Sequence, residues 1–433
     1  MDLEKLNKSR VYVNTLTEKD DGKKVTVAGW LYDSRDLGKV RFIVLRDISG
    51  DIQITALKDK ADKEIFDAMS KTPRESVIVI TGTVKKSDKA PNGREIIPES
   101  FEILATAESP LPIDTSDFSK TELPKRLDYR FLDLHRRYTQ AIFKIQSTIS
   151  STFKNHFINK GFIDIQPPSI ISTSSEGGTE LFPVQYFEKK AFLAQSPQLY
   201  KQMVACAIEK VVTITPVWRA EKHNTIRHLN ESRQMDIEVA FANQFTIMEH
   251  LEEAVQDIVK TIIEKNKDEL KLLGLTLKVP KAIYLSYEET MKKLGVKPGE
   301  DLTPEQEKKL CEMYKEDIVF VHSWPSNLRG FYIMRKDADA EAKLTEGFDA
   351  LYKGVEISSG GQRIHIPELL EKMLKKKGLN PKNFTHYIDS FKYGAPPHAG
   401  WSIGLERFTT TLLELNNIRE AVLFPRDRDR LTP

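Results

Sequence analysis

The N-terminal part of the chain carries short segments in which apolar residues alternate with polar ones, and this pattern restricts the fold more than any other feature. The segments are residues 25–32, 41–46, 51–57, 76–84 and 95–104. Alternation with a period of two residues is typical of strands that have one buried face. Turns separate the segments, one at Ser49-Gly50 and another at Pro91-Asn92-Gly93.

A short segment with helical spacing, residues 61–69, lies between the third predicted strand and the fourth. Five strands with a helix at this place are the order of an OB barrel, which commonly binds single-stranded nucleic acid. A small barrel that contacts another protein has the same strand order and remains the alternative.

Residues 109–121 are rich in proline, serine, threonine and aspartate, a composition that predicts a connection between domains. The chain has 433 residues, which is more than one hydrophobic core usually serves. We therefore expect an OB domain at residues 1–107, a linker or hinge at 108–135 and a second domain at 136–433.

The second domain mixes helices with strands. Helical spacing links Ile142, Ile145, Ile149, Phe153 and Phe157. It predicts a long amphipathic helix that ends near Lys160-Gly161, and a second helix is predicted at residues 246–265. An alternating strand is expected to contain Met235, Ile237, Val239 and Phe241. Because strands and helices are interspersed, the predicted class is α+β.

Composition narrows the function only in part. The net charge is +2, so bulk charge does not indicate a nucleic-acid-binding protein, although local basic patches remain available for it. Cys206 and Cys311 are the two cysteines, and their separation argues against a disulfide scaffold or a thiolate zinc site. The chain starts without an apolar signal core, and no run of about eighteen apolar residues occurs, so we expect a cytoplasmic protein.

Neither a Walker loop nor a strand-linked G-x-G-x-x-G occurs, so a bound nucleotide would have to be held by charged side chains. Arg219-Ala220-Glu221 offers a guanidinium fork for phosphate and an acceptor for an amino group. Arg227 and His228 follow in a polar loop, and a strand returns through Asp236 and Glu238. Reading His223 and His228 as metal ligands is disfavoured, because no cysteine lies near them.

Three further stretches combine polar side chains with glycine or a helix start. Gly177 and Gly178 lie among carboxylates in residues 176–182, which indicates a loop over a pocket or a simple turn. Gln198 and Lys201 are three residues apart behind Pro197, so a helix would place both on one face, where an amide and an ammonium suit a small zwitterion. The remaining groups lie at Glu356, Ser359, Arg363 and in the run Gly404-Leu405-Glu406-Arg407. Each of these alone is more often an ordinary surface residue than a ligand.

Together these stretches resemble the class II aminoacyl-tRNA synthetases of the aspartate, asparagine and lysine subgroup, over residues 25–433. Residues 161–168, 216–241 and 404–407 are similar to the three ordered motifs of that family. The resemblance implies an OB-fold anticodon-binding domain, a catalytic domain built on an antiparallel sheet flanked by helices, and a homodimer. It also implies ATP as a substrate and Mg²⁺ as the cofactor.

Within the subgroup, residues 194–202 (AQSPQLYKQ) resemble the aspartate enzymes. The asparagine enzymes carry leucine at the position of Lys201, and Arg363 adds a second cation suited to an acidic substrate. The short length and residues 424–433 resemble archaeal members. The resemblance therefore implies activation of L-aspartate with ATP and its transfer to tRNA-Asp. An asparagine–tRNA ligase, an asparagine synthetase on the same catalytic domain and a non-catalytic tRNA-binding protein remain as alternatives.

The resemblance also assigns roles to individual residues. Arg219 and Arg407 would be catalytic, because they neutralise phosphate charge. Aspartate would be bound by Glu176, Gln198, Lys201, Arg219, Asp236, Ser359 and Arg363. ATP would be bound by Arg219, Glu221, Arg227, His228, Leu229, Glu356, Gly404, Leu405, Glu406 and Arg407. Mg²⁺ would be held by Glu356 and Ser359, and an anticodon would meet Arg35, Phe42 and Gln53.

Several positions depart from the family pattern or bear on tRNA choice. The family commonly has an aromatic residue on adenine where this chain has Ser232-Arg233, so Arg233 is a candidate to stack there instead. Relatives that also charge tRNA-Asn tend to have proline at the position of Pro91, and restricted ones tend to have tryptophan at that of Tyr32. The proline without the tryptophan favours charging of both tRNA-Asp and tRNA-Asn.

Overall fold

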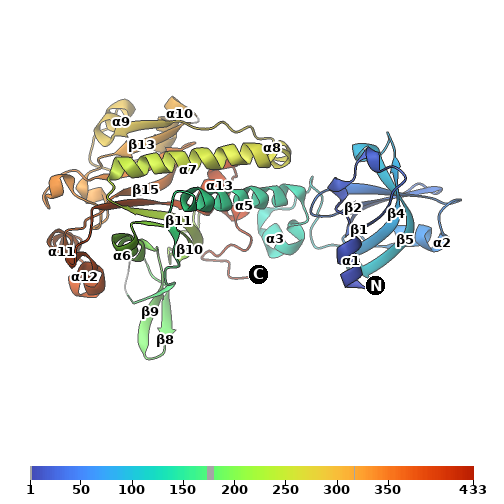
Figure 1. The fold of residues 1–433 in the computed structure, drawn as a ribbon, viewed down its shortest axis with the longest axis horizontal. Helices are drawn as coiled ribbons and strands as arrows, with labels where there is room; N and C mark the ends of the chain where they lie inside the picture. Colours follow the sequence, from blue (N-terminus) through green and yellow to red (C-terminus); the bar gives the residue numbers. More distant parts are fainter. Residues whose placement is uncertain (1, 173–179, 316) are drawn as a thin grey trace. The chain divides into compact units, whose positions relative to one another are not determined.

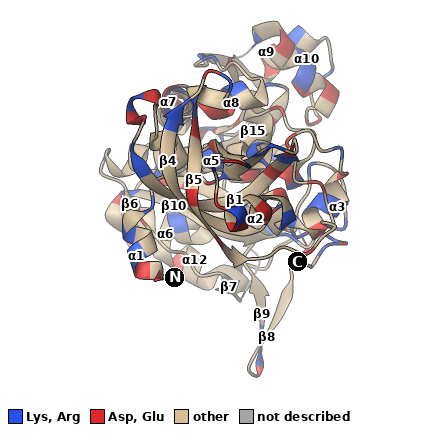
Figure 2. Cartoon of the chain, turned by 90° about the vertical axis from the view of Figure 1, so that its right-hand side faces the viewer, with Lys and Arg blue, Asp and Glu red and all other residues tan. Residues whose placement is uncertain are grey.

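The computed structural model describes residues 2–172, 180–315 and 317–433. The chain divides into two compact units, Met1–Lys120 and Thr121–Pro433 (Figure 1). Basic and acidic residues are interspersed along the helices and strands, in keeping with the small net charge (Figure 2). Among the described residues, no helix is both long and apolar enough to cross a lipid bilayer.

The first unit is a closed five-stranded barrel, as predicted. Its strands are β1 (Lys24–Asp36), β2 (Val40–Arg46), β3 (Asp51–Leu57), β4 (Val77–Lys86) and β5 (Arg94–Ala105). They close in the order β1-β2-β3-β5-β4, and helix α2 (Lys63–Lys71) lies between β3 and β4 in the chain. The interior is filled by alternate strand residues such as Val27, Leu31, Ile43, Ile54 and Ile80. A short helix that was not predicted, α1 (Leu3–Ser9), precedes the barrel, and the Asp2 side chain caps it.

The second unit is built on an eight-stranded sheet in the order β12-β13-β14-β15-β16-β11-β10-β6. The strands are β6 (Ile163–Asp164), β10 (Lys210–Trp218), β11 (Glu231–Ala240), β12 (Ala282–Ser286), β13 (Ile318–His322), β14 (Gly347–Tyr352), β15 (Val355–Gln362) and β16 (His398–Gly404). Neighbours from β13 to β10 are antiparallel, but the two edge pairs are parallel. The expectation of an antiparallel sheet is thus corrected at its edges. The β12–β13 pair is parallel because helices α9 (Tyr287–Leu294) and α10 (Pro304–Tyr314) provide the crossover.

Helices α5 (Arg137–Ile158) and α7 (Gln244–Lys265) pack with the sheet in one hydrophobic core. The predicted apolar positions of α5 are all buried, and α7 begins where the Asn243 side chain accepts from the backbone N–H of Phe245 and Thr246. On β11, Met235, Ile237 and Val239 enter this core. Phe241 does not continue the strand, because β11 ends at Ala240 and the Phe241 side chain is exposed at a φ of 57°.

The remaining elements of the second unit surround this core. A small sheet contains β7 (Ile170–Ile171), β8 (Pro183–Tyr186) and β9 (Lys189–Leu193). The other helices are α6 (Gln198–Ile208), α8 (Lys267–Leu273), α11 (Pro367–Lys376), α12 (Thr385–Lys392) and α13 (Leu405–Leu412).

Two helices, α3 (Leu123–Asp128) and α4 (Arg130–Asp133), lie within the range 108–135 where a linker was expected. They are ordered by the fully buried Asp133 carboxylate, which ion-pairs with Arg130 at 2.6 Å, Arg136 at 3.2 Å and Arg126 at 3.5 Å. Arg130 also donates to the backbone carbonyls of Glu420 and Val422 near the C-terminus. Composition could not reveal this, because two of the groups that hold Arg130 lie 290 and 292 residues later in the chain.

Replacing Asp133 with alanine is expected to lower the free energy of unfolding by about 3–5 kcal/mol, because several guanidinium groups would stay buried without their carboxylate. The matched control is Asp128→Ala, since Asp128 pairs with Arg430 through a side chain that is 56% exposed. The control should cost less than about 1 kcal/mol. Urea unfolding of both variants checks this, and equal losses would contradict the structural role of Asp133.

Candidate active site

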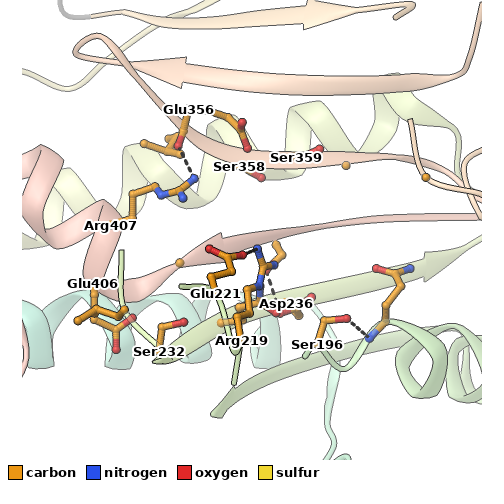
Figure 3. Close-up of a pocket in the computed structure, with 18 of the residues that line it drawn as sticks. Ser196, Arg219, Glu221, Ser232, Asp236, Glu356, Ser358, Ser359, Glu406 and Arg407 are labelled. Carbon is orange, nitrogen blue, oxygen red and sulfur yellow. Dashed lines mark hydrogen bonds and ion pairs between the residues drawn. The ribbon is translucent and has the colours of Figure 1, made fainter. Parts of the chain in front are cut away.

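A cavity of about 300 Å³ opens on the second unit, lined by residues of β11, β15, β16 and the loop after β10 (Figure 3). It gathers most of the residues that the resemblance assigned to aspartate and ATP: Gln198, Arg219, Glu221, Arg227, His228, Leu229, Asp236, Glu356, Ser359, Arg363, Gly404, Glu406 and Arg407. Leu405 is buried in the hydrophobic core, and Lys201 is buried next to the lining residue Asp236. Glu176 lies outside the described residues.

Arg219 and Glu221 begin the loop that leaves β10. Their side chains approach to 3.9 Å, and Glu221 also lies 4.0 Å from His228. The Asn230 amide closes the loop, because it donates to the carbonyl of Arg219 at 2.7 Å and to that of Glu221 at 3.0 Å. The Arg219 side chain is 39% exposed, so its guanidinium remains accessible to an anion from the cavity.

The tip of this loop is tied to the C-terminal segment by Arg419, which the sequence did not single out. Arg419 donates to the Thr225 carbonyl at 3.0 Å and to the Asn224 side chain at 2.6 Å. It also ion-pairs with Asp427 at 2.6 Å. The loop that carries Arg227 and His228 is therefore held by residues almost two hundred positions later in the chain.

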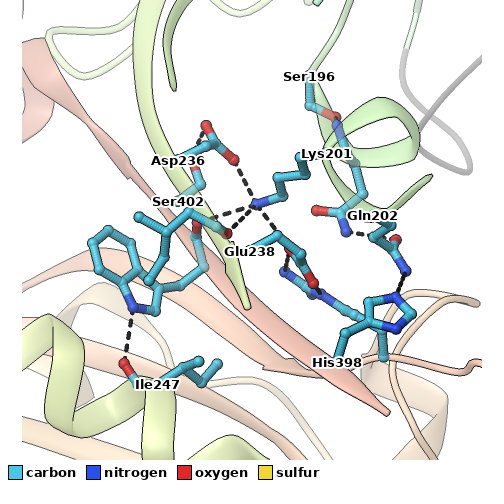
Figure 4. A network of polar contacts seen from close by, with 12 residues as sticks. Ser196, Lys201, Gln202, Asp236, Glu238, Ile247, His398 and Ser402 are labelled. Atoms are coloured by element: carbon cyan, nitrogen blue, oxygen red, sulfur yellow. Dashed lines mark hydrogen bonds and ion pairs between the residues drawn. The ribbon is translucent and has the colours of Figure 1, made fainter. Parts of the chain in front are cut away.

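Two cations and two carboxylates meet at the inner end of the cavity, almost without solvent: Lys201, Asp236, Glu238 and Arg363 (Figure 4). Lys201 Nζ lies 2.6 Å from Asp236 and 3.4 Å from Glu238. Arg363 binds Glu238 through Nε at 2.9 Å and Nη2 at 3.3 Å. Because Glu238 holds the Nε side of the guanidinium, the edge formed by Nη1 and the second Nη2 hydrogen remains for a ligand.

The carboxylates of this four-charge cluster differ in their electrostatics. Burial raises the pKa of Asp236, and the nearby Lys201 offsets this only in part. Burial also acts on Glu238, but the positive charges of Arg363 and Lys201 outweigh it and lower the pKa of Glu238. Glu238 thus stays charged and acts as the counter-ion of both cations. The sequence signal for it was an acid two residues after Asp236, on the same face of the strand, between the apolar residues Ile237 and Val239.

The opposite wall of the cavity carries carboxylates that suit a hard cation. Burial and the neighbouring Asp349 raise the pKa of Glu356 to about 7. Asp349 is paired with Arg329, which also donates to Ser359 at 3.4 Å, and Arg407 donates to the Glu356 carbonyl (Figure 3). A divalent cation would relieve the repulsion between the two carboxylates. Among the described residues no cluster of three or more His, Cys, Asp or Glu forms a protein-only metal site. The donors fit a Mg²⁺ that takes its other ligands from phosphate and water.

The expectation that Arg233 stacks in place of an aromatic residue is wrong. Ser232, Gln234 and Asp236 line the cavity, whereas Arg233 lines a separate cavity and pairs with Glu231 at 3.0 Å. The cause is strand alternation, which turns odd-numbered residues of β11 away from the cavity. Only the backbone N–H of Arg233 reaches the neighbourhood of the site, where it donates to both oxygens of Glu406.

In the barrel, the three residues expected to meet an anticodon share one face. Arg35 lies opposite Phe42 across β1 and β2, and Phe42 lies opposite Thr55 across β2 and β3. Gln53 is two residues before Thr55 on β3, and it donates to Glu95 at 2.9 Å. The Arg35 side chain is 75% exposed.

Tyr32 and Pro91, expected to affect tRNA choice, lie in different surroundings. The Tyr32 ring is covered by the guanidinium of Arg46 at 3.5 Å, and its hydroxyl accepts from the Asp117 backbone N–H at 3.4 Å. Pro91 begins the short turn Pro91–Gly93 before β5.

Changing Glu238 to glutamine should lower the free energy of unfolding by about 3 kcal/mol, because Arg363 and Lys201 would lose a buried counter-ion. Glu231→Gln at the other end of β11 is the control, since Glu231 pairs with a side chain that is 42% exposed. That change should cost less than about 1 kcal/mol. Thermal and urea unfolding without ligands measure both, and a stable Glu238→Gln protein would refute the counter-ion role.

Comparison with known proteins agrees with this geometry. Residues 122–428 match the family of class II tRNA synthetases (D, K and N), and residues 25–104 match an OB-fold nucleic acid binding domain. The chain is 46% identical to the aspartate–tRNA(Asp/Asn) ligase of Methanocaldococcus jannaschii, with 95% of each chain covered. It is 45% identical to the aspartate–tRNA(Asp) ligase of Pyrococcus horikoshii, covering 98% of this chain and 99% of the relative. The crystal structure of P. horikoshii asparaginyl-tRNA synthetase with asparaginyl-adenylate superposes with a TM-score of 0.90 at 32% identity, covering 98% and 99% of the two chains. The chain belongs to the class II tRNA synthetases of the D, K and N group.

Proposed function

We propose that the chain is an aspartate–tRNA ligase, which activates L-aspartate with ATP and transfers it to the 3′ end of tRNA. The observation that carries this is the Nη1 edge of the Arg363 guanidinium at the cavity, which makes no hydrogen bond to the described residues and lies beside the ammonium of Lys201. The names of relatives that are 45–46% identical over nearly the whole chain support it.

The choice of aspartate over asparagine rests on Lys201. The solved asparaginyl enzyme shares the fold, so the fold alone does not discriminate between the two substrates. With Lys201, the two cations of the four-charge cluster balance Asp236 and Glu238. Leucine in place of Lys201 would leave one net negative charge there and repel the side-chain carboxylate of aspartate. The balanced cluster therefore favours aspartate.

The proposed chemistry needs positioning and charge neutralisation rather than a general acid or base. The α-carboxylate of aspartate attacks the α-phosphorus in line, and pyrophosphate leaves. Arg219 binds the α-phosphate, while Arg227, His228 and Arg407 meet the outer phosphates or the adenine face. In the second step the terminal ribose 3′-hydroxyl of tRNA attacks the mixed anhydride, and AMP leaves.

Glu221 is placed to accept from the adenine amino group, and Asp236 is placed near the α-ammonium of aspartate. Glu356 and Ser359 would hold Mg²⁺, with Asp349 close by. The cation supplies charge neutralisation on the phosphates when it is bound. Glu176, Leu229 and the backbone of Gly404 complete the proposed binding set.

The barrel is proposed to bind the anticodon through the face that carries Arg35, Phe42 and Gln53. Stacking of one base on Phe42 would contribute about 1–3 kcal/mol. The chain has proline at position 91 and tyrosine, not tryptophan, at position 32. This combination favours charging of both tRNA-Asp and tRNA-Asn. Relatives of both kinds are about equally similar to the chain, so overall identity does not decide between them.

We also propose a cytoplasmic homodimer. Apolar side chains are exposed at the end of α5 (Ile158) and on the edge strand β6 (Ile163), and Ile170 on β7 and Phe241 after β11 are exposed as well. A second copy would cover such a surface. Cys206 and Cys311 are free thiols, which suits a reducing compartment.

Exchange of pyrophosphate into ATP should depend on aspartate and not on asparagine. Arg363→Lys should raise the KM for aspartate by about a hundredfold or more, because an ammonium cannot bind Glu238 and a substrate carboxylate through two edges. The KM for ATP should change little. Arg233→Lys, outside the cavity, is the control and should leave both values unchanged. Exchange driven by asparagine alone would replace this proposal with an asparagine–tRNA ligase.

Aminoacylation of purified tRNA-Asp and tRNA-Asn, side by side, should show charging of both. Pro91→Lys should reduce charging of tRNA-Asn and preserve that of tRNA-Asp, because it adds a cation in the turn before β5. Pro91→Ala removes the ring without adding charge, so it separates the two effects. If the Pro91→Lys variant charges both tRNAs to the same extent as the unmodified protein, Pro91 has no part in tRNA choice.

A further inference from the structure

A chain of hydrogen bonds runs from Gln198, at the cavity, into the core behind it (Figure 4). Gln198 Nε2 donates to Gln202 Oε1 at 2.7 Å, and the Tyr387 hydroxyl donates to the same oxygen at 2.8 Å. Gln202 Nε2 lies 2.9 Å from His398 Nε2, and His398 Nδ1 lies 3.0 Å from the Pro396 carbonyl oxygen. Gln202 and His398 are fully buried.

The direction of every hydrogen bond in this chain follows from its last bond, between His398 Nδ1 and the Pro396 carbonyl oxygen. A carbonyl oxygen only accepts, so His398 Nδ1 must carry the proton that it donates to Pro396. In a neutral imidazole Nε2 is then an acceptor, and the amide nitrogen of Gln202 must face it. The Gln202 oxygen therefore faces Tyr387 and Gln198. The nitrogen of Gln198 faces Gln202, which leaves the Gln198 oxygen for the cavity.

We propose that Gln202 is a positioning residue that fixes the Gln198 side-chain amide with its oxygen toward the substrate, and that neutral His398 sets this direction. The oxygen accepts from the α-ammonium of the bound amino acid. The reversed amide would place an N–H₂ group against the ammonium, two donors without an acceptor. This inference rests on the proposed function, because it takes an amino acid as the ligand.

The surroundings of His398 keep its imidazole neutral. Burial lowers its pKa, and Arg363 and His365 act in the same direction, whereas Glu238 on β11 and the bond to Pro396 oppose them. Cys206 on α6 lies 3.9 Å from Nδ1, the Phe391 ring of α12 stacks on the imidazole, and Tyr387 of α12 reaches it only through Gln202. Protonation would put a donor on Nε2 opposite the Gln202 amide nitrogen. Gln202 would then turn over, and Gln198 would follow.

Gln202→Glu should introduce a pH dependence that the unmodified protein lacks near neutral pH. A carboxylate still accepts from Gln198 and Tyr387, but it opposes the lone pair of neutral His398 and is matched only by protonated His398. Between about pH 8 and pH 6, the KM for aspartate should stay nearly constant in the unmodified protein, because the lowered pKa of His398 keeps its imidazole neutral there. In Gln202→Glu the KM should fall over the same range, because the new carboxylate favours protonated His398. Gln202→Leu removes the bonds to Gln198, Tyr387 and His398 and should raise this KM at least about tenfold at every pH, the size of a lost charged hydrogen bond.

The readout is ATP–pyrophosphate exchange by the full-length protein, with the KM for ATP as the internal control, since Gln198 is not proposed to touch ATP. Cys206→Ala removes a neighbour of His398 outside the amide chain and should leave both KM values unchanged. Thermal unfolding shows whether each variant is folded. If Gln202→Leu does not fold, the different pH slopes of the unmodified protein and Gln202→Glu decide alone.

Equal pH slopes in these two proteins, or an unchanged KM in a folded Gln202→Leu, would overturn the positioning role. If ATP–pyrophosphate exchange by the unmodified protein depends on asparagine and not on aspartate, the proposed function is overturned instead. The same variants are then measured with asparagine, whose α-ammonium is identical, so the role of Gln202 is still decided.

Discussion

Two cations and two carboxylates are buried together at Lys201, Asp236, Glu238 and Arg363. The surrounding elements offset the desolvation of these charges with hydrogen bonds and close packing. Lys201 Nζ completes its coordination with the carbonyls of Ile237 and Trp401, so its three donors are used. Strands β11 and β16 can close on this cluster because Gly400 has no side chain. A Cβ there would collide with the Glu238 carboxylate and the Ile237 carbonyl. Isolated charges at this depth would be strongly destabilising, so the cluster forms as a unit or not at all.

The two ends of the cavity are built differently. At the end proposed for the amino acid, buried ion pairs and the amide chain through Gln202 fix the side chains. The end proposed for the nucleotide contains Arg219, Arg407 and a polar loop that is more exposed and is held by Arg419 from the C-terminal segment. Rigid placement suits discrimination between two small substrates that differ in one group, because misplaced donors are costly. A loop suits a ligand that enters and leaves in each cycle.

Much of the fold and site could be predicted from local patterns, because they depend on periodicity and on motifs close in sequence. The barrel order, α5 and α7 follow from spacing alone, and β11 alternation already separates Asp236 and Glu238 from Met235 and Ile237. The same parity places Arg233 with Met235, away from the cavity, so the stacking expectation conflicted with a signal that the sequence contains. The helices α3 and α4 were not predictable in this way, since Arg130 on α4 also donates to the carbonyls of Glu420 and Val422, 290 and 292 residues later in the chain.

The sequence by itself determined the family, the order of elements and most of the side chains that face the cavity, because these depend on residue type and local spacing. Only the tertiary structure decided which side chains pair with one another. It gave Arg363 a protein counter-ion in Glu238, placed Asp349 beside Glu356, and joined Gln202 to a histidine almost two hundred residues later. Such pairings form across separate strands and helices, where sequence distance carries no information about spatial distance. The direction in which Gln198 points depends on the tautomer of that histidine, which is set by a backbone carbonyl that no sequence pattern marks.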